Sequence, residues 1–441
     1  MKTLPAEKAI TLITPGSRVV LPHGCIEPHS LFRALGRSRG VPEAPPTLYT
    51  GMQFGDYEFL GPAPGAARPR AGETDRDPAE EAARGALGPG YRFVTWQVGP
   101  RLRRFVERGR IGILPLRFRD IPRAFGPDGP LRADAVLIQC APPQDGAVNL
   151  GISCSIFPGL IAAARLVIAE IHPDMPRTSG ATQIPLDLID VAVDADGPLG
   201  TLARSGADAV DHAIVQRVLG LVPESAWVQL GVGAIPDLIL AALGEVPGVR
   251  IHSGMLTDTL SDFLDRAPAG TRVVTGELEG SLTMYRRAAA DPRVSLQPTT
   301  LTHDVPHLAQ LERFVSINSA LEVDLAGQVN GETIDGVQVS GVGGSLDFVE
   351  AARCSPGGRS IIALRSLAKG RSRIVPRLSA GTAVTLPRHV VDYVVTEHGV
   401  ARLFGLDLEA RAQALIAIAA PEAQSELERS RGRLLHERDD L

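Results

Sequence analysis

A short polar stretch, His252-Ser253-Gly254-Met255, separates an apolar run from a pattern typical of a helix. In α/β proteins the end of a strand is where ligands usually bind. The glycine brings no side chain to such a place. A turn that requires backbone freedom is the first explanation for it.

Two glycine-rich turns offer backbone N–H groups instead of side chains. Gly231 to Pro236 lies between an expected strand at 226–230 and an expected helix at 238–243, and the second turn, 339–345, precedes an expected helix at 348–353. The free amides of a helix start suit a phosphate or a developing oxyanion. A tight turn without a ligand is the alternative for both. Pro236 replaces the third glycine of a dinucleotide fingerprint, so a dinucleotide is not favoured.

Other polar residues give weaker indications. The alternation at 316–330 predicts a strand with one buried face, along which Asn318, Glu322 and Gln328 either line a site or only face solvent. Glu397 and His398 are adjacent, and alternation on a strand would point them to opposite faces. The remaining histidines show no metal-ligand spacing and are expected to be surface or hydrogen-bonded residues: His23, His29, His172, His303 and His307.

Composition narrows the class of protein. A chain of 441 residues, 44% hydrophobic and 22% charged, is expected to form two globular domains. A net charge of −5 without long single-sign blocks argues against nucleic acid or an anionic membrane as partner. Four scattered cysteines predict free thiols in a reducing cytoplasm, and no apolar run is long enough to span a membrane.

Short apolar runs alternate with amphipathic ones, which predicts βαβ units and mainly parallel sheets. The segment 61–90 is rich in Pro, Gly and charge and is expected to be a long loop with one short helix near 79–84. A domain boundary is expected near 197–207, and the tail 422–441 is expected to be a charged helix. The predicted strands are 17–21, 135–139, 166–170, 226–230, 271–275 and 360–364.

Eight strings occur in order along nearly the whole chain: GSRVVLPHGCIEP, DAVLIQCAPPQDGAVNLGIS, ARLVIAEIHPDMPRTSG, QLGVGAIPDLIL, RFVSINSALEVDLAGQVN, VSGVGGSLDFVEAA, VVTEHGVARLFG and RAQALIAIAAPE. Together they resemble the acetyl-CoA hydrolase/transferase family. The resemblance implies two related α/β domains, here 1–205 and 206–441, with the site at their interface. It also implies a homodimer, coenzyme A as a substrate, no tightly bound cofactor and no metal. The partners would be acyl-CoA and, for transfer, a carboxylate acceptor.

The resemblance also implies site residues. The backbone of Gly231, Val232, Gly233, Ala234 and Ile235 would line the CoA site. The second turn would bind CoA or the thioester oxygen, and a lysine in the string SLAKG would contact a CoA phosphate; these residues are Gly341, Gly344, Ser345 and Lys369.

The family's nucleophile is a glutamate in a string of the form H-[ST]-E-M. The corresponding string here places Gly254 at that position, so the usual glutamyl thioester cannot form there. The nearest acids are Asp258, Glu277 and Glu279. Glu279 is the candidate substitute, as nucleophile or as base, and a surface acid without a role is the alternative.

Two hypotheses follow. The first is an acyl-CoA hydrolase or CoA-transferase that works without the glutamyl intermediate, in which Gly254 makes room for the attacking water or carboxylate. The second is a protein that binds CoA but has lost catalysis and acts as a sensor or partner subunit.

Overall fold

The computed structural model describes residues 1–38, 44–55, 58–60, 91–204 and 206–436. The predicted loop and short helix within 61–90 lie outside them. The chain divides into two compact units after Thr201, with two short segments exchanged, whereas the sequence analysis placed the boundary after residue 205. The first unit contains Met1–Leu116, Asp120–Thr201 and Val337–Gly341, and the second contains Arg117–Arg119, Leu202–Gly336 and Val342–Leu441.

The first unit is built on a sheet whose main strands run parallel in the order β1-β10-β8-β6-β2-β3-β4-β5, with β7 and β9 as an antiparallel extension of β6. Its strands are β1 (Lys2–Thr3), β2 (Arg18–Val20), β3 (Thr47–Thr50), β4 (Arg92–Thr95), β5 (Gly112–Ile113), β6 (Ala135–Gln144), β7 (Ala147–Asn149), β8 (Leu166–Ile171), β9 (Gln183–Pro185), β10 (Val191–Asp194) and β19 (Val337–Gln338). Its helices are α1 (Ala6–Ile10), α2 (His29–Arg37), α4 (Arg103–Val106), α5 (Ile121–Phe125) and α6 (Phe157–Ala163). Short 3-10 turns are η1 (Gly24–Ile26), η2 (Glu58–Leu60) and η4 (Leu186–Leu188).

The second unit has a sheet in the order β14-β13-β12-β11-β15-β20-β24-β25, parallel except for β25. The strands are β11 (Trp227–Leu230), β12 (Arg250–Thr257), β13 (Val273–Glu279), β14 (Val294–Leu296), β15 (Phe314–Asn318), β20 (Arg359–Ala363), β24 (Tyr393–Thr396) and β25 (Gly399–Arg402). Smaller pieces are β16 (Glu322–Asp324), β17 (Val329–Asn330), β18 (Thr333–Ile334), β21 (Leu367–Ala368), β22 (Arg371–Ser372) and β23 (Ile374–Val375). The helices are α7 (Ala209–Leu219), α8 (Ala234–Leu243), α9 (Thr259–Arg266), α10 (Leu282–Ala290), α11 (Thr299–Thr302), α12 (Val305–Leu308), α13 (Ser345–Cys354), α14 (Leu408–Ala417) and α15 (Pro421–His436).

Both sheets follow the same path. The chain moves outward from β2 through β3, β4 and β5, and then returns to place β6 beside β2; likewise it moves outward from β11 to β14 and returns to place β15 beside β11. The prediction of two related α/β units with mainly parallel sheets is therefore confirmed. In each unit the order reverses between the first strand and the returning strand, and crevices for ligands form at such a reversal.

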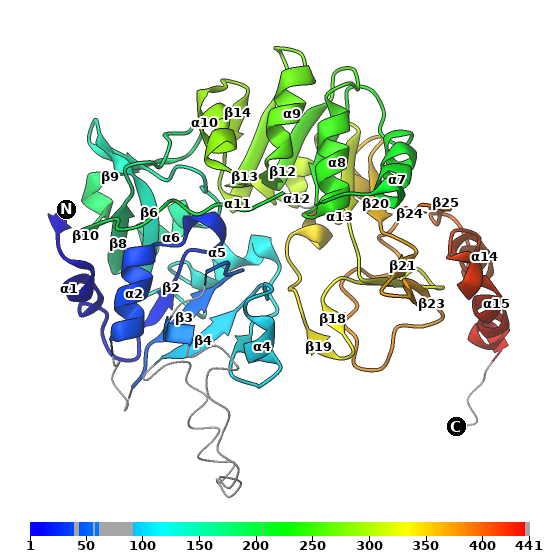
Figure 1. Cartoon of the computed structure of the whole chain (residues 1–441), viewed down its shortest axis with the longest axis horizontal. Coiled ribbons are helices and arrows are strands. Elements are labelled where there is room, and N and C mark those ends of the chain that lie inside the picture. The colour runs from blue at the N-terminus through cyan, green and yellow to red at the C-terminus, as the bar shows by residue number, and fades with distance from the viewer. Residues whose placement is uncertain (39–43, 56–57, 61–90, 205, 437–441) are drawn as a thin grey trace, which may run out of the picture. The chain divides into compact units, whose positions relative to one another are not determined.

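The reversal also distributes the helices of the second unit. Parallel crossovers are right-handed in nearly all proteins, so strands added in opposite directions carry their helices on opposite faces of the sheet. Helices α8, α9 and α10 pack side by side and follow β11, β12 and β13 (Figure 1). In contrast, α11 packs on β12 and β13, and α13 packs on β15 and β20 from the other face.

Several sequence predictions differ from the structure in ways that affect the site. The stretch from His252 to Met255 lies inside β12, not in a turn after it. Strand β15 is buried along its whole length, whereas its alternating polar pattern predicted one exposed face. Glu397 and His398 form the hairpin turn between β24 and β25, and Glu397 accepts hydrogen bonds from Ser366. No helix in the described ranges is long and apolar enough to cross a membrane.

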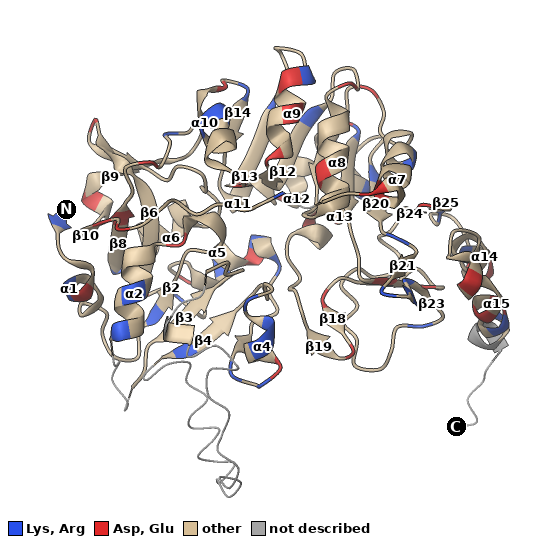
Figure 2. Cartoon of the chain, viewed as in Figure 1, with Lys and Arg blue, Asp and Glu red and all other residues tan. Residues whose placement is uncertain are grey.

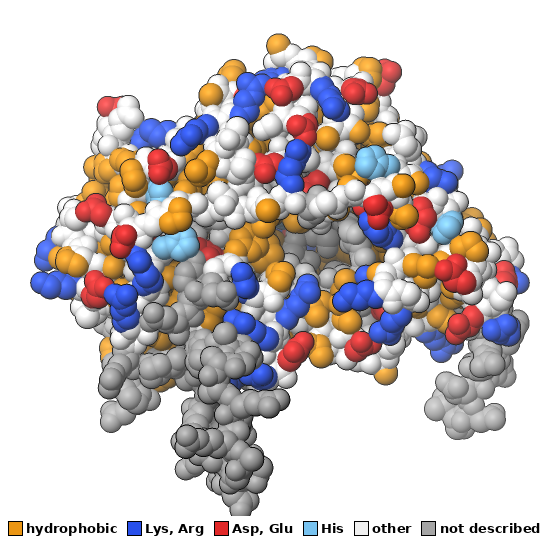
Figure 3. All heavy atoms as spheres, viewed as in Figure 1, with side chains coloured by type: hydrophobic (Ala, Val, Ile, Leu, Met, Phe, Trp, Pro, Cys, Tyr) orange, Lys and Arg blue, Asp and Glu red, His pale blue; other side chains and the backbone are white. Residues whose placement is uncertain are grey.

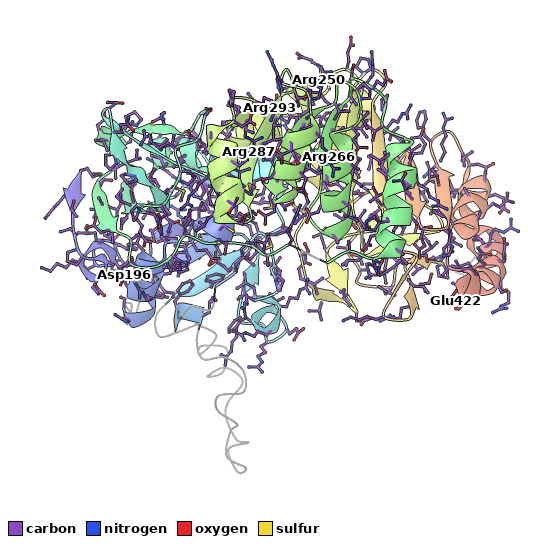
Figure 4. The ribbon with its side chains drawn as sticks, turned by 45° about the horizontal axis from the view of Figure 1, so that its top comes forward. Asp196, Arg250, Arg266, Arg287, Arg293 and Glu422 are labelled. Carbon is purple, nitrogen blue, oxygen red and sulfur yellow. The ribbon has the colours of Figure 1, made fainter. Side chains whose placement is uncertain are left out.

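Charged side chains gather on the outer helices of the second unit. Figure 2 shows acidic and basic residues on α8, α9 and α10, and Figure 3 shows the two signs interspersed over the same helices. Two arginines of this region, Arg266 and Arg293, are labelled in Figure 4 and differ in burial. Arg293 is 13% exposed and binds the carboxylate of Asp291 as well as the carbonyls of Leu264 and Ala267 at the end of α9. Arg266 is 50% exposed and lies 3.6 Å from Glu245.

We expect Arg293→Met to lower the free energy of unfolding by about 3 kcal/mol at pH 7, because it removes the closest cationic partner of the buried carboxylate of Asp291 and leaves only Arg287, at 3.8 Å. The matched control Arg266→Met should cost less than about 1 kcal/mol, because its ion pair is exposed. Urea unfolding of the two variants measures both changes in unfolding free energy. Equal decreases would contradict the larger contribution expected of Arg293.

The same pair predicts a pH dependence. Hydrogen bonds from Arg293 lower the pKa of Asp291, so this carboxylate stabilises the folded state above its unfolded pKa. That contribution is lost as the pH falls below about 4. The difference in stability between the wild type and Arg293→Met should therefore narrow at pH 3.5, and a constant difference would be the contrary result.

Candidate active site

Gly254 lies in the middle of β12, between the register pairs Ser253–Thr275 and Met255–Glu277. Its φ is not in the left-handed region, so its backbone conformation is open to any residue. The explanation for the glycine is space. A Cβ atom on Gly254 would lie 2.8 Å from Cε1 and 2.9 Å from Nε2 of His303, and 3.7 Å from Phe348. The imidazole of His303 therefore occupies the volume into which a side chain at residue 254 would project.

This volume, hereafter the 254 position, is enclosed on several sides. His303 is 3% exposed, and its ring centroid lies 5.1 Å from that of Phe118 and 4.6 Å from that of Phe348. Its Nδ1 atom is 2.9 Å from the hydroxyl of Thr302. The ring is thus held by packing and by one hydrogen bond, and it cannot swing aside without a cost to the core.

The second glycine at this position is Gly344. A Cβ atom there would lie 2.5 Å from both Cδ2 and Nε2 of His303 and 3.0 Å from Phe348. Gly344 is also the N-cap residue of α13, and no side chain caps this helix start. The hydroxyl of Ser345 donates to the carbonyl of Val342 at 3.4 Å. Nε2 of His303 therefore lies against the amino end of α13, where backbone amides favour negative charge.

Burial controls the charge of this histidine. Desolvation lowers the pKa of His303 to about 3, with smaller contributions from the charges of His252 and Arg119. His252 is also buried, and desolvation lowers its pKa to about 3. Both imidazoles are uncharged at neutral pH. Sequence analysis did not single out His303, because its relation to Gly254 arises only from the packing of α11 against β12.

The turn at Gly231 connects β11 with α8. Its N–H group donates to the carbonyl of Ile317 at 2.8 Å, which joins the turn to β15 at the reversal of the sheet. Gly233 has a φ of 130°, a conformation that favours glycine, and it precedes α8 without any side-chain cap. Val232 is 50% exposed, and Ala234 and Ile235 open the helix. The starts of α8 and α13 both lack a side-chain cap, and anion binding by their amides stays a prediction.

Buried polar side chains hold the two strands together at the reversal. Gln229 of β11 accepts hydrogen bonds from Ser316 at 2.7 Å and from Asn318 at 3.1 Å, both on β15. It also donates to Asn318 at 3.2 Å. Asn318 was a predicted site residue, and the structure places it beside Gly231, whose Cβ position lies 3.2 Å from its Oδ1 atom. The other two predicted residues of this string bind neighbouring side chains, Glu322 with Asn330 and Gln328 with Asp324.

Glu279 lies on the other face of the sheet from the 254 position. It pairs with Thr257, and Glu277 pairs with Met255, so alternation directs both carboxylates away from the face of Gly254. Both side chains are buried, whereas the sequence analysis kept open a surface role. Glu279 lines a pocket of about 40 Å³ together with Leu202, Ala203, Arg204, Val232, Gly233, Asp237, Thr257 and Asp258.

This pocket is acidic. Thr257 donates to Asp237 at 2.6 Å, and burial raises the pKa of Asp237. Asp258 accepts hydrogen bonds from the backbone and hydroxyl of Ser281. Three carboxylates and one arginine line it together with Val232 and Gly233 of the predicted CoA turn. A role for Glu279 as nucleophile or base stays a prediction.

Two further residues, Lys369 and Gly341, were predicted to belong to the CoA site. Lys369 and Gly370 form the tip of the exposed hairpin between β21 and β22, both with positive φ. Gly341 belongs to the first unit, where a Cβ atom would lie 2.2 Å from the carbonyl oxygen of Trp96. A role for either residue in binding CoA stays a prediction.

Comparison with known proteins identifies the class. Residues 86–201 match the N-terminal domain, and residues 280–431 the C-terminal domain, of acetyl-CoA hydrolase/transferase. A 4-hydroxybutyrate coenzyme A transferase from Clostridium kluyveri is 34% identical over 437 residues, covering 97% of this chain and 96% of that protein. A butyryl-CoA:acetate CoA-transferase from Anaerostipes caccae is 31% identical over 76% of this chain and 80% of that protein.

Solved structures agree with this result. RipA from Yersinia pestis aligns with a TM-score of 0.86 at 28% identity, over 98% of each chain. A 4-hydroxybutyrate CoA-transferase from Porphyromonas gingivalis aligns with a TM-score of 0.76 at 28% identity, again over 98% of each chain. The chain belongs to the acetyl-CoA hydrolase/transferase family, and its relatives are enzymes that act on CoA thioesters.

The fit between residues 254 and 303 predicts a steric coupling. Gly254→Ala should lower the free energy of unfolding by about 1–3 kcal/mol, because the added methyl group overlaps the enclosed imidazole. Gly270→Ala is the matched control in the same unit, since nothing lies within 4 Å of its Cβ position. In a double-mutant cycle, His303→Ala should remove at least about 1 kcal/mol of the cost of Gly254→Ala. Additive losses in denaturant unfolding would contradict the contact.

Proposed function

We propose that this chain acts on short-chain acyl-CoA thioesters, by hydrolysis or by transfer of CoA to a carboxylate, without a glutamyl-CoA intermediate. Membership of the family supports the substrate class. One observation supports the absence of the intermediate. The imidazole of His303 fills the 254 position, so a carboxylate has no room at the residue where the family resemblance predicts one.

In this proposal, backbone amides bind CoA and stabilise the negative charge that develops on the thioester oxygen. The turn from Gly231 to Ile235 would line the CoA site, and Gly341, Gly344 and Ser345 would bind CoA or the thioester oxygen. The uncapped starts of α8 and α13 support these roles, because their free N–H groups stabilise negative charge on an anionic ligand or an oxyanion. Lys369, exposed at its hairpin tip, would contact a CoA phosphate.

The chemical step needs an external attacker. An oxygen of water, or of an acceptor carboxylate, would bond to the thioester carbonyl carbon while its π electrons move to the carbonyl oxygen. Amides at the start of α13 would stabilise that oxyanion. Collapse of the tetrahedral species breaks the C–S bond and releases CoA as a thiolate. After attack by water, this thiolate takes up a proton. After attack by an acceptor carboxylate, it attacks the acceptor's carbonyl carbon in the mixed anhydride, which forms the new thioester and expels the original acid as a carboxylate. The sequence analysis expected Gly254 to leave room for this attacker, but the structure shows His303 in that space.

Hydrolysis and transfer are separated by adding acceptors. We expect purified protein to release free thiol from acetyl-, propionyl- or butyryl-CoA, and a rate that rises with acetate or succinate would indicate transfer. Mass spectrometry of the protein during turnover should find no acyl or CoA adduct on any carboxylate. A trapped glutamyl adduct would contradict the proposal.

The alternative of a CoA-binding protein without catalysis makes a different prediction. It requires CoA binding by calorimetry together with no turnover across the same panel of thioesters. Such a result would replace the first proposal. A homodimer, a cytoplasmic location and the absence of a tightly bound cofactor stay predictions from the sequence.

A further inference from the structure

The imidazole of His303 fills the space beside Gly254, and the position of its Nε2 atom suggests a chemical role. Nε2 of His303 lies 2.9 Å from the Cβ position of Gly254 and 2.5 Å from that of Gly344. We propose that His303 is the proton acceptor for the attacking water, in the place where the resemblance predicts a carboxylate. This inference rests on the proposed function and adds a named base to it.

The hydrogen bonds of the ring are consistent with this role. The hydroxyl of Thr302 is 3.4 Å from the carbonyl oxygen of Pro298, to which it donates. In the tautomer that carries its proton on Nδ1, which this proposal requires, the same hydroxyl accepts Nδ1–H of His303 at 2.9 Å. This arrangement leaves the lone pair of the neutral imidazole on Nε2. No hydrogen-bond donor among the described residues reaches Nε2 in the structure.

The surroundings determine how strong this base is. The rings of Phe118 and Phe348 bring no charge, and the nearest titratable or charged groups from packed elements are His252 on β12 and Arg119. Burial among them lowers the pKa of His303 to about 3. An ordinary glutamate has a pKa near 4.3. The buried imidazole is therefore a weaker base than an ordinary carboxylate, and it is unprotonated at neutral pH.

The step can be written in full. Nε2 removes a proton from water as the water oxygen bonds to the thioester carbonyl carbon, and the start of α13 receives the developing oxyanion. The tetrahedral species then collapses, the C–S bond breaks, and the proton on Nε2 passes to the sulfur. The products are a carboxylic acid and CoA thiol, and His303 returns to its neutral form.

The main test compares His303→Gln with His307→Gln under hydrolytic conditions. Glutamine keeps much of the volume of histidine, so the fold should survive, which thermal unfolding checks. We expect His303→Gln to lower kcat by about 100-fold or more with little change in CoA affinity. His307 lies on α12 and does not meet the 254 position, so His307→Gln should keep wild-type rates.

A pH profile distinguishes this base from an ordinary histidine and from a structural role. In the wild type, kcat/KM should stay level from pH 8 to about pH 5, because the group is already unprotonated there. A fall in kcat/KM centred near 6.5 would contradict the inference. So would a wild type that turns over while His303→Gln keeps its rate within threefold. A wild type without any turnover would overturn both this inference and the proposed function.

A single and a double variant test whether His303 excludes a carboxylate from the 254 position. Gly254→Glu alone should form no glutamyl adduct with acyl-CoA, because His303 excludes the carboxylate. Gly254→Glu combined with His303→Ala should form an adduct at residue 254, identified by peptide mass spectrometry. An adduct in the single variant would show that His303 does not hold the 254 position.

Discussion

The hydrogen bonds among Gln229, Ser316 and Asn318 are the constraint on which the site depends. They join β11 to β15, two neighbouring strands from which the chain proceeds in opposite directions along the sheet. A parallel sheet tends to open a crevice at such a reversal, and unpaired amide side chains buried there would be costly. Because each group finds a partner in the other strand, the turn at Gly231 and the end of β15 are held at a fixed separation.

Two glycines and one histidine determine the shape of the candidate site beside these strands. Gly254 and Gly344 come from a strand and from a helix start that are distant in sequence, and both provide space for the same imidazole. A side chain at either position would displace His303 from its contacts with Phe118 and Phe348. The resemblance predicts a carboxylate at residue 254, and in the structure a neutral nitrogen of His303 lies where a side chain of residue 254 would project.

Much of the fold follows from the alternation of apolar runs and helical patterns, since βαβ units leave few topologies. The strand at 135–139 and the helix after Gly233 both occur, with bounds shifted by a few residues. The polar pattern of β15 was misleading because its serine and asparagine are satisfied by a partner strand, which a single sequence does not display. Gly254 looked like a turn residue because local patterns carry no information about the ring of His303, which follows α11 and packs against β12.

The enclosed position of His303 has a consequence for the response to salt. An uncharged group shielded by two phenylalanines has no field for mobile ions to screen, in contrast to exposed charges separated by more than a Debye length of about 8 Å at physiological ionic strength. Added salt therefore acts mainly on the approach of the polyanionic CoA, because burial lowers the pKa of His303 more than the charge of Arg119 does. Ionic strength then varies the encounter with CoA more than it varies the protonation of His303.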